Sequence, residues 1–349
     1  MTSNNFHTSF QINGKSFSNS EELIAFSQSI SKEINQFLKE WFSIDPYIVV
    51  KTSGSTGNPK SISLRKDFMI NSALATGSYF QLGENTKALC CLPINFIAGK
   101  MMLVRALVLG WNLDVIEPTS NPLQEITKEY DFSAMVPLQL RNSFSKIDQI
   151  KTLIVGGGVV SKDLEKAIQT VNTKCYATYG MTETITHIAI KKLNKFTQLE
   201  LESVSVYKTL SDITISKDKR SCLVIHAPKV SDETIITNDV VELITNTKFI
   251  WKGRIDHVVN SGGVKLHPEE IEQKLSDVIH DRFFVVGIPD EILGEKLILL
   301  IEGKKRQITS KHFSKLSRFE IPRTTYFIPK FLETGTGKIN RHKTLDLIR

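Results

Sequence analysis

One stretch decides how this chain is to be understood, and it reads Thr52-Ser53-Gly54-Ser55-Thr56-Gly57-Asn58-Pro59-Lys60. It combines two glycines, four hydroxyl side chains and a lysine, directly after a β-branched run at residues 47–50. Glycine lets backbone amides approach an anion closely, hydroxyls donate hydrogen bonds to phosphate oxygens, and lysine neutralises charge. The stretch is not a Walker A loop, because that motif places glycine directly before the lysine. It therefore predicts a phosphate-binding loop, and the alternative is an ordinary surface loop.

Strand-like and helical stretches alternate along the chain. Short apolar runs that predict strands lie at residues 87–92, 114–116, 134–136 and 152–155. Stretches with helical character lie at residues 20–42, 100–109 and 161–171. This alternation favours an α/β layered fold with parallel strands, whereas short β-rich runs in 200–250 predict a mostly antiparallel subdomain. A further change of pattern near 254–256 predicts a boundary between domains 1–254 and 255–349.

The charge and cysteine content narrow the class of protein. Forty-four Lys and Arg residues against 37 Asp and Glu give a net charge of +7. This excess suits an anionic ligand but is too dispersed to indicate nucleic acid. The four cysteines form no CxxC pair, so zinc chemistry has no support and a reduced, cytoplasmic setting is expected. The apolar stretch 88–111 contains Asn95, Lys100 and Arg105, so we expect buried core rather than a membrane span, and no signal-peptide pattern is present.

Further motifs follow the first one. A triple glycine at residues 156–158 comes directly after an expected strand, where a ligand or another backbone segment can approach closely. The run Tyr179-Gly180-Met181-Thr182-Glu183 offers a flat ring, a hydroxyl and a hard oxygen ligand suited to magnesium. Downstream come Gly253-Arg254-Ile255-Asp256, Ser261-Gly262-Gly263 and a lysine within the glycine-rich run 334–341. Taken singly, each also fits a simple turn or a solvated tail.

In this order and spacing the motifs resemble those of the adenylate-forming superfamily of acyl-CoA synthetases, nonribosomal adenylation domains and luciferases. The resemblance covers residues from about 47 to 349. It implies a large layered N-terminal domain with β-sheets flanked by helices, a β-rich subdomain, and a small mobile α+β C-terminal domain. The residues that it places around ATP are Thr52, Ser53, Gly54, Ser55, Thr56, Gly57, Lys60, Gly156, Gly157, Gly158, Tyr179, Gly180, Asp239 and Arg254. Asn238 stands where the superfamily has a glycine before the aspartate.

The resemblance also implies an activity. The superfamily uses ATP to convert a carboxylic acid into an acyl-adenylate and pyrophosphate, and a thiol, usually that of coenzyme A, then displaces AMP. Lys338 would bridge the acid and the α-phosphate, Thr182 would bind the α-phosphate, and Glu183 would bind Mg²⁺. Asp256 would be the hinge of the C-terminal domain, and Gly262 and Gly263 would line the CoA channel.

The segment containing Asn95, Lys100 and Arg105 aligns with the superfamily's acid pocket. Cations in so apolar a stretch either recognise a second carboxylate of the substrate or hold a structural role with their head groups in water. The first interpretation points to a short dicarboxylic aromatic acid. The short N-terminal region and the expected helix at residues 97–102 resemble those of compact bacterial o-succinylbenzoate–CoA ligases of menaquinone biosynthesis. A ligase for another aryl or fatty acid and a nonthiolating adenylate-binding protein remain alternatives. The sequence leaves a homodimer open.

Overall fold

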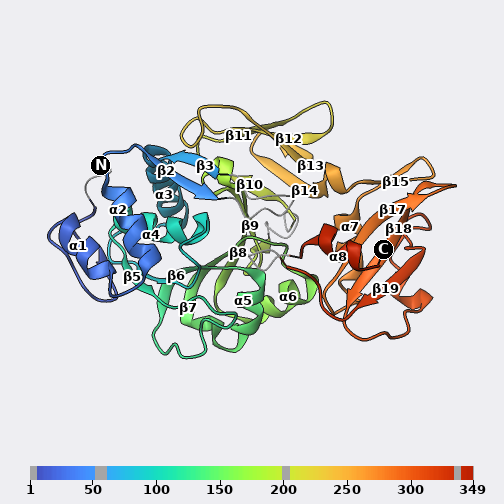
Figure 1. The fold of residues 1–349 in the computed structure, drawn as a ribbon, viewed down its shortest axis with the longest axis horizontal. Helices are drawn as coiled ribbons and strands as arrows, with labels where there is room; N and C mark the ends of the chain where they lie inside the picture. Colours follow the sequence, from blue (N-terminus) through green and yellow to red (C-terminus); the bar gives the residue numbers. More distant parts are fainter. Residues whose placement is uncertain (1–5, 52–60, 199–204, 334–338, 349) are drawn as a thin grey trace.

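The computed structural model describes residues 6–51, 61–198, 205–333 and 339–348. Within them, one large sheet with helices on both faces occupies most of the molecule, and a smaller sheet lies at the C-terminal end (Figure 1). In spatial order the large sheet contains β1 (Gln11–Ile12), β5 (Asn112–Val115), β4 (Lys87–Cys90), β6 (Tyr130–Met135), β7 (Ile150–Val155), β8 (Lys174–Gly180), β9 (His187–Lys192), β10 (Tyr207–Thr209), β14 (Lys248–Arg254), β13 (Ile235–Thr245), β12 (Cys222–His226) and β11 (Thr214–Lys217). A separate hairpin pairs β2 (Tyr47–Lys51) with β3 (Ser61–Arg65).

Strand direction divides the large sheet at β8. The strands from β1 to β8 pair in parallel, and those from β8 to β11 pair antiparallel. The expected α/β fold is therefore confirmed. The β-rich stretch 200–250 is antiparallel as expected, but it extends the same sheet instead of forming one of its own.

Helices cover the parallel part of the large sheet on both faces, and the last two helices of the chain pack against the smaller sheet. Their bounds are α1 (Ser20–Ser27), α2 (Lys32–Phe42), α3 (Lys66–Phe80), α4 (Ile97–Leu109), α5 (Pro137–Asn142), α6 (Lys162–Ala167), α7 (Pro268–Leu275) and α8 (Arg341–Leu345). Ala88 and Cys90 of β4 pack into the core cluster that holds α3 and α4. Leu89 and Cys91 pack into the cluster that holds α5 and α6. Because both faces of β4 are buried, its sequence is a continuous apolar run.

The single helix expected at residues 20–42 is wrong, because the structure has two. Ser31 adopts an extended conformation, and its hydroxyl accepts a hydrogen bond from the backbone amide of Ile34 at 3.1 Å. This is a helix N-cap, so a new helix begins at Lys32. None of the helices in the described ranges is long and apolar enough to cross a membrane.

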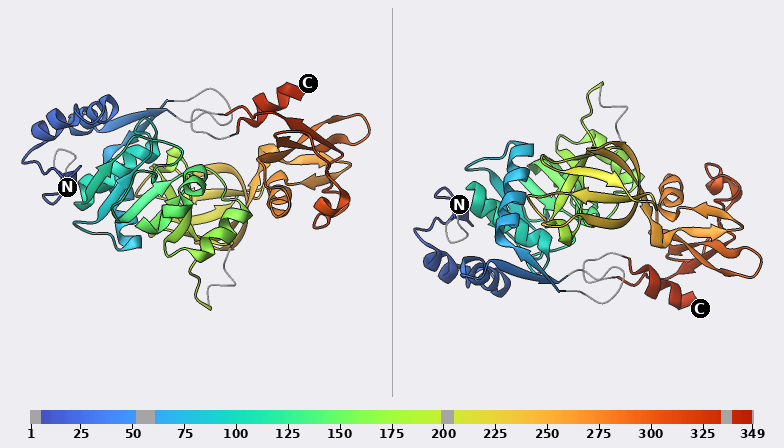
Figure 2. Two further views of the ribbon diagram at one scale, coloured as in Figure 1. Left: turned by 90° about the horizontal axis from the view of Figure 1, so that it is seen from below. Right: turned by 90° about the horizontal axis from the view of Figure 1, so that it is seen from above.

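The smaller sheet follows β14. Its strands in spatial order are β16 (Val264–Leu266), β15 (Val259–Ser261), β18 (Gly294–Glu302) and β17 (Phe283–Asp290), with β19 (Thr324–Ile328) pairing along β18. Gly262 and Gly263 connect β15 to β16 with φ values of +57° and +82°. Positive φ at both central residues is the requirement of a type I′ hairpin turn, which glycine meets without strain. Figure 2 shows this sheet at the opposite end of the molecule from the N-terminus.

Candidate active site

The motif glycines at the ends of β7 and β8 are required by close contacts. A Cβ on Gly156 would lie 2.6 Å from Thr178 Oγ1, and a Cβ on Gly180 would lie 2.1 Å from the carbonyl oxygen of Thr186. Gly157 has a φ of +76°, a region that side chains disfavour. Both motifs therefore lie at the carboxyl ends of adjacent parallel strands, which is where open α/β sheets bind ligands.

The threonine and glutamate of the second motif begin a short 3-10 helix, Thr182–Thr184. The Glu183 carboxylate is exposed and forms no ion pair with any described residue. No group of three or more His, Cys, Asp or Glu residues in the described ranges could hold a metal by itself. A lone carboxylate nevertheless suits Mg²⁺, because that ion is commonly held by one or two carboxylates together with substrate phosphates and water.

A strained turn closes the same motif. Ile185 has φ 64° and ψ −61°, and the Thr186 amide donates to the Thr184 carbonyl oxygen at 2.7 Å. This is a γ-turn of the rare, strained hand, and a β-branched residue is the least suited to positive φ. The side chain of Ile185 is 1% exposed, so core packing holds it there. Backbone strain of this kind concentrates at functional sites. No pattern in the sequence signals it.

Asp239 lies at the centre of a polar cluster beside the motif. The Tyr179 hydroxyl donates to Asp239 Oδ2 at 2.6 Å, and Trp251 Nε1 donates to Oδ1 at 3.1 Å. Burial, together with the Asp239 charge, raises the pKa of Tyr179 well above its usual value, so the phenol stays protonated and donates. Each carboxylate oxygen keeps a second lone pair that can accept from a ligand. The motifs in the sequence predict Tyr179 and Asp239 as site residues, but they give no signal for Trp251.

Arg254 joins this cluster to the start of the smaller sheet. It lies opposite Asp239 in the β13–β14 ladder, and its Nε and Nη2 donate to the two oxygens of Asp256 at 3.0 and 2.9 Å. The hydrogen bonds that Arg254 donates to Asp256 raise the pKa of Arg254. Burial acts to raise the pKa of Asp256, but the hydrogen bonds from Arg254 outweigh it and the net direction is down. Arg254, which is expected at the ribose, and Asp256, which is expected at the hinge, therefore form a charged pair.

Arg105 is a buried cation without a carboxylate partner among the described residues. It is 1% exposed, and its guanidinium donates to Thr76 Oγ1 at 3.3 Å and to Thr186 Oγ1 at 3.4 Å, with Met102 Sδ at 3.8 Å. Burial lowers its pKa to about 10. The Thr186 contact places the guanidinium directly behind the strained turn. Three long contacts to neutral groups leave this charge poorly compensated.

The other two residues expected at the acid pocket, Lys100 and Asn95, have surroundings different from those of Arg105. Lys100 Nζ lies 4.8 Å from the centroid of the Phe37 ring of α2, so it contacts the outer helical layer, and burial lowers its pKa. Asn95 is exposed in the turn before α4. The phosphate-loop residues 52–60 and Lys338 lie outside the described residues.

The family model for "AMP-binding enzyme" matches residues 8–215, more than half of the chain. The chain belongs to this AMP-binding family. A solved member, the acyl-CoA synthetase (AMP-forming)/AMP-acid ligase II-like protein of Dyadobacter fermentans, is 37% identical. The match covers 91% of this chain and 95% of that one, with a TM-score of 0.60. The o-succinylbenzoate coenzyme A synthetase (MenE) of Bacillus subtilis, solved with ATP and magnesium ion, shares the fold at 18% identity. That match covers 94% of this chain and 82% of the other, with a TM-score of 0.75.

Several curated relatives are named 2-succinylbenzoate–CoA ligase. The 2-succinylbenzoate–CoA ligase of Enterococcus faecalis is 24% identical over 335 residues, and the match covers 84% of this chain and 68% of the relative. The Escherichia coli enzyme of the same name is 25% identical, with coverage of 83% and 66%. The chain thus spans about two thirds of the length of these relatives.

Proposed function

We propose that this chain is an AMP-forming acid–CoA ligase and that its acid is o-succinylbenzoate, as in menaquinone biosynthesis. The curated relatives named 2-succinylbenzoate–CoA ligase support the activity. The observation that carries the choice of acid is Arg105, a guanidinium that is 1% exposed and has no carboxylate partner among the described residues. o-Succinylbenzoate has two carboxylates, so one can react while the other neutralises this buried charge.

In the first half-reaction a carboxylate oxygen of the acid attacks the α-phosphorus of ATP, and pyrophosphate leaves. Both reactants are anionic, so the protein must align them and offset charge. Asp239 and Arg254 would bind the ribose, Gly156–Gly158 and Tyr179 the adenine, and Thr182 the α-phosphate. Residues 52–60 would hold the β- and γ-phosphates. Mg²⁺, held by Glu183 and phosphate oxygens, would supply positive charge to the leaving pyrophosphate.

In the second half-reaction the thiol of coenzyme A attacks the acyl carbon and AMP leaves. Lys338, which would bridge acid and α-phosphate during adenylation, must then vacate the site. We propose that residues 255–349 rotate about Asp256, which brings Gly262 and Gly263 to the pantetheine channel. The position of Asp256 supports a pivot there, because it lies in the short connection between β14 of the large sheet and β15 of the smaller sheet.

ATP–pyrophosphate exchange, screened over o-succinylbenzoate, benzoate and fatty acids, tests this function. We expect exchange that depends on o-succinylbenzoate and Mg²⁺, followed by thioester formation when coenzyme A is added. Exchange with a monocarboxylate alone would replace the proposed acid with another one. Adenylate formation without any thioester would mean a nonthiolating enzyme.

A further inference from the structure

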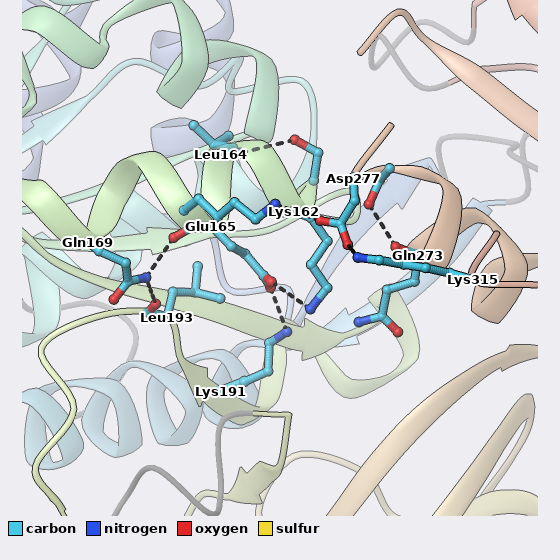
Figure 3. Close-up of polar contacts among 12 residues, drawn as sticks. Lys162, Leu164, Glu165, Gln169, Lys191, Leu193, Gln273, Asp277 and Lys315 are labelled. Atoms are coloured by element: carbon cyan, nitrogen blue, oxygen red, sulfur yellow. Dashed lines mark hydrogen bonds and ion pairs between the residues drawn. The ribbon is translucent and has the colours of Figure 1, made fainter. Parts of the chain in front are cut away.

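Two side-chain contacts join α6 to the segment that follows α7. Lys166 Nζ lies 2.7 Å from Asp277 Oδ1, and His280 Nδ1 lies 2.5 Å from Asp163 Oδ2. Lys166 and Asp163 belong to the large-sheet part of the molecule, and their partners belong to the part that carries the smaller sheet. Figure 3 shows Asp277 between the two parts, with Lys315 approaching its carboxylate.

Asp277 is bound from both sides. Its second oxygen, Oδ2, accepts from Lys315 Nζ at 2.5 Å, and Lys315 lies on the same side of the boundary as Asp277. One carboxylate therefore makes one contact across the boundary and one within its own part. The hydrogen bonds from Lys166 and Lys315 lower the pKa of Asp277 to about 2. The carboxylate is thus charged at neutral pH, and both contacts are ionic.

The arrangement that these pairs hold can be assigned to one half-reaction. Strands β2 and β3 flank residues 52–60, and α8 follows residues 334–338. In both views of Figure 2 the β2–β3 hairpin and α8 lie on the same side of the molecule. The chain segments that lead to the proposed phosphate loop and to Lys338 therefore lie on one side of the molecule, as adenylation requires.

We propose that Lys166 and Asp163 are positioning residues that hold the C-terminal part in its adenylation orientation through Asp277 and His280. This inference rests on the proposed function, because it presupposes a second orientation for thioester formation. Lys166 and His280 are 66% and 68% exposed. Exposed pairs contribute modestly to stability and are screened by salt. We therefore expect the loss of one pair to shift the balance between the two orientations by about threefold. Contacts this weak can also break in every catalytic cycle.

Asp277 supplies a matched pair of variants. K166Q removes the contact across the boundary, whereas K315Q removes the contact within the C-terminal part. We expect K166Q to lower ATP–pyrophosphate exchange about threefold at low salt and to leave thioester formation from supplied acyl-adenylate equal or faster. K166R should restore exchange, and K315Q should change neither half-reaction. Equal changes in both half-reactions for K166Q, or the same behaviour in K166Q and K315Q, would overturn the proposal.

A second readout needs no acid substrate. All four native cysteines are buried, so spin labels can be attached to the exposed positions created by N142C and K304C. We expect K166Q to alter the distance distribution between these labels in the free protein, and K315Q to match the parent. Identical distributions in all three proteins would refute the positioning role. Should the parent protein fail to use o-succinylbenzoate, the proposed function fails, while the label distances still test the positioning role.

Discussion

Replacing Arg105 with methionine separates the substrate role of this side chain from its effect on stability. In the free protein Arg105 is 1% exposed, and among the described residues its guanidinium donates hydrogen bonds only to two threonine hydroxyls and a thioether. Methionine fills a similar volume without a charge. We therefore expect R105M to be more stable than the parent protein and to bind o-succinylbenzoate poorly, so that the two effects have opposite signs.

The size of the stability change follows from the pKa. Burial lowers the pKa of Arg105 from its usual 12.5 to about 10, and one pKa unit corresponds to about 1.4 kcal/mol. The buried charge thus costs about 3 kcal/mol at neutral pH. Packing differences at the site subtract from this figure, so we expect R105M to raise the free energy of unfolding by about 1–2 kcal/mol. The loss of a charge-assisted contact to the substrate should raise the KM for o-succinylbenzoate by about 30- to 100-fold.

The pH dependence of this difference has a definite sign. Because the pKa of Arg105 is lower in the folded chain, the unfolded chain holds more protons above pH 10 and the parent gains stability as pH rises there. The advantage of R105M should be constant from pH 7 to pH 9 and shrink above about pH 10.

Denaturant unfolding and ATP–pyrophosphate exchange measure the two effects. R318M, at an exposed arginine that forms no ion pair with any described residue, is the control for the arginine-to-methionine change and should alter neither quantity. Benzoate-dependent exchange, where it is detectable, should be similar in R105M and the parent. A less stable R105M that keeps the parent's KM for o-succinylbenzoate would refute the reasoning.

Three further outcomes are expected at the motifs. K338A should lower adenylate formation by about 10²–10³-fold and spare thioester formation from supplied acyl-adenylate; equal loss of both half-reactions in rapid-quench assays would contradict this. G180A should lower the free energy of unfolding by about 1–3 kcal/mol, because its Cβ meets backbone that cannot rotate away, whereas G83A, with nothing within 4 Å of its Cβ, should be neutral in thermal melts. Y179F removes the 2.6 Å hydrogen bond to Asp239 and should raise the KM for ATP about tenfold with little change in kcat; a fall in kcat alone would argue against a ground-state binding role.

The sequence predicted the fold well where one physical signal dominated. The alternation of apolar strands with helices indicated the parallel part of the sheet, because strands covered on both faces are continuously apolar, as at Leu89 and Cys90. Ser31 shows the limit of periodicity. The apolar spacing of residues 20–42 is continuous, yet one hydroxyl cap starts a second helix there.

Parts of the candidate site could not be predicted, because they depend on the packing of distant segments. Trp251 reaches Asp239 only through the register of β13 and β14. The strained conformation of Ile185 arises because its side chain is packed in the core while Gly180 brings the neighbouring backbone into close contact. Lys100 and Arg105 illustrate the same point. They looked alike in the sequence, but one faces Phe37 and the other faces Thr186.

The Arg254 guanidinium explains how one side chain can serve both the nucleotide and the pivot. A guanidinium has five N–H donors, and the fork to Asp256 uses only Nε and Nη2. The remaining donors can therefore meet a ribose hydroxyl without breaking the fork. A lysine would carry the same charge but has no planar fork to satisfy both partners at once. Asp239 lies opposite Arg254 in the ladder and accepts a hydrogen bond from Tyr179 at the end of β8. Hydrogen bonds and backbone pairing therefore connect Tyr179 to Asp256 through Asp239 and Arg254. The proposed pivot thus directly follows the pair of strands that carries Asp239 and Arg254 of the proposed nucleotide site.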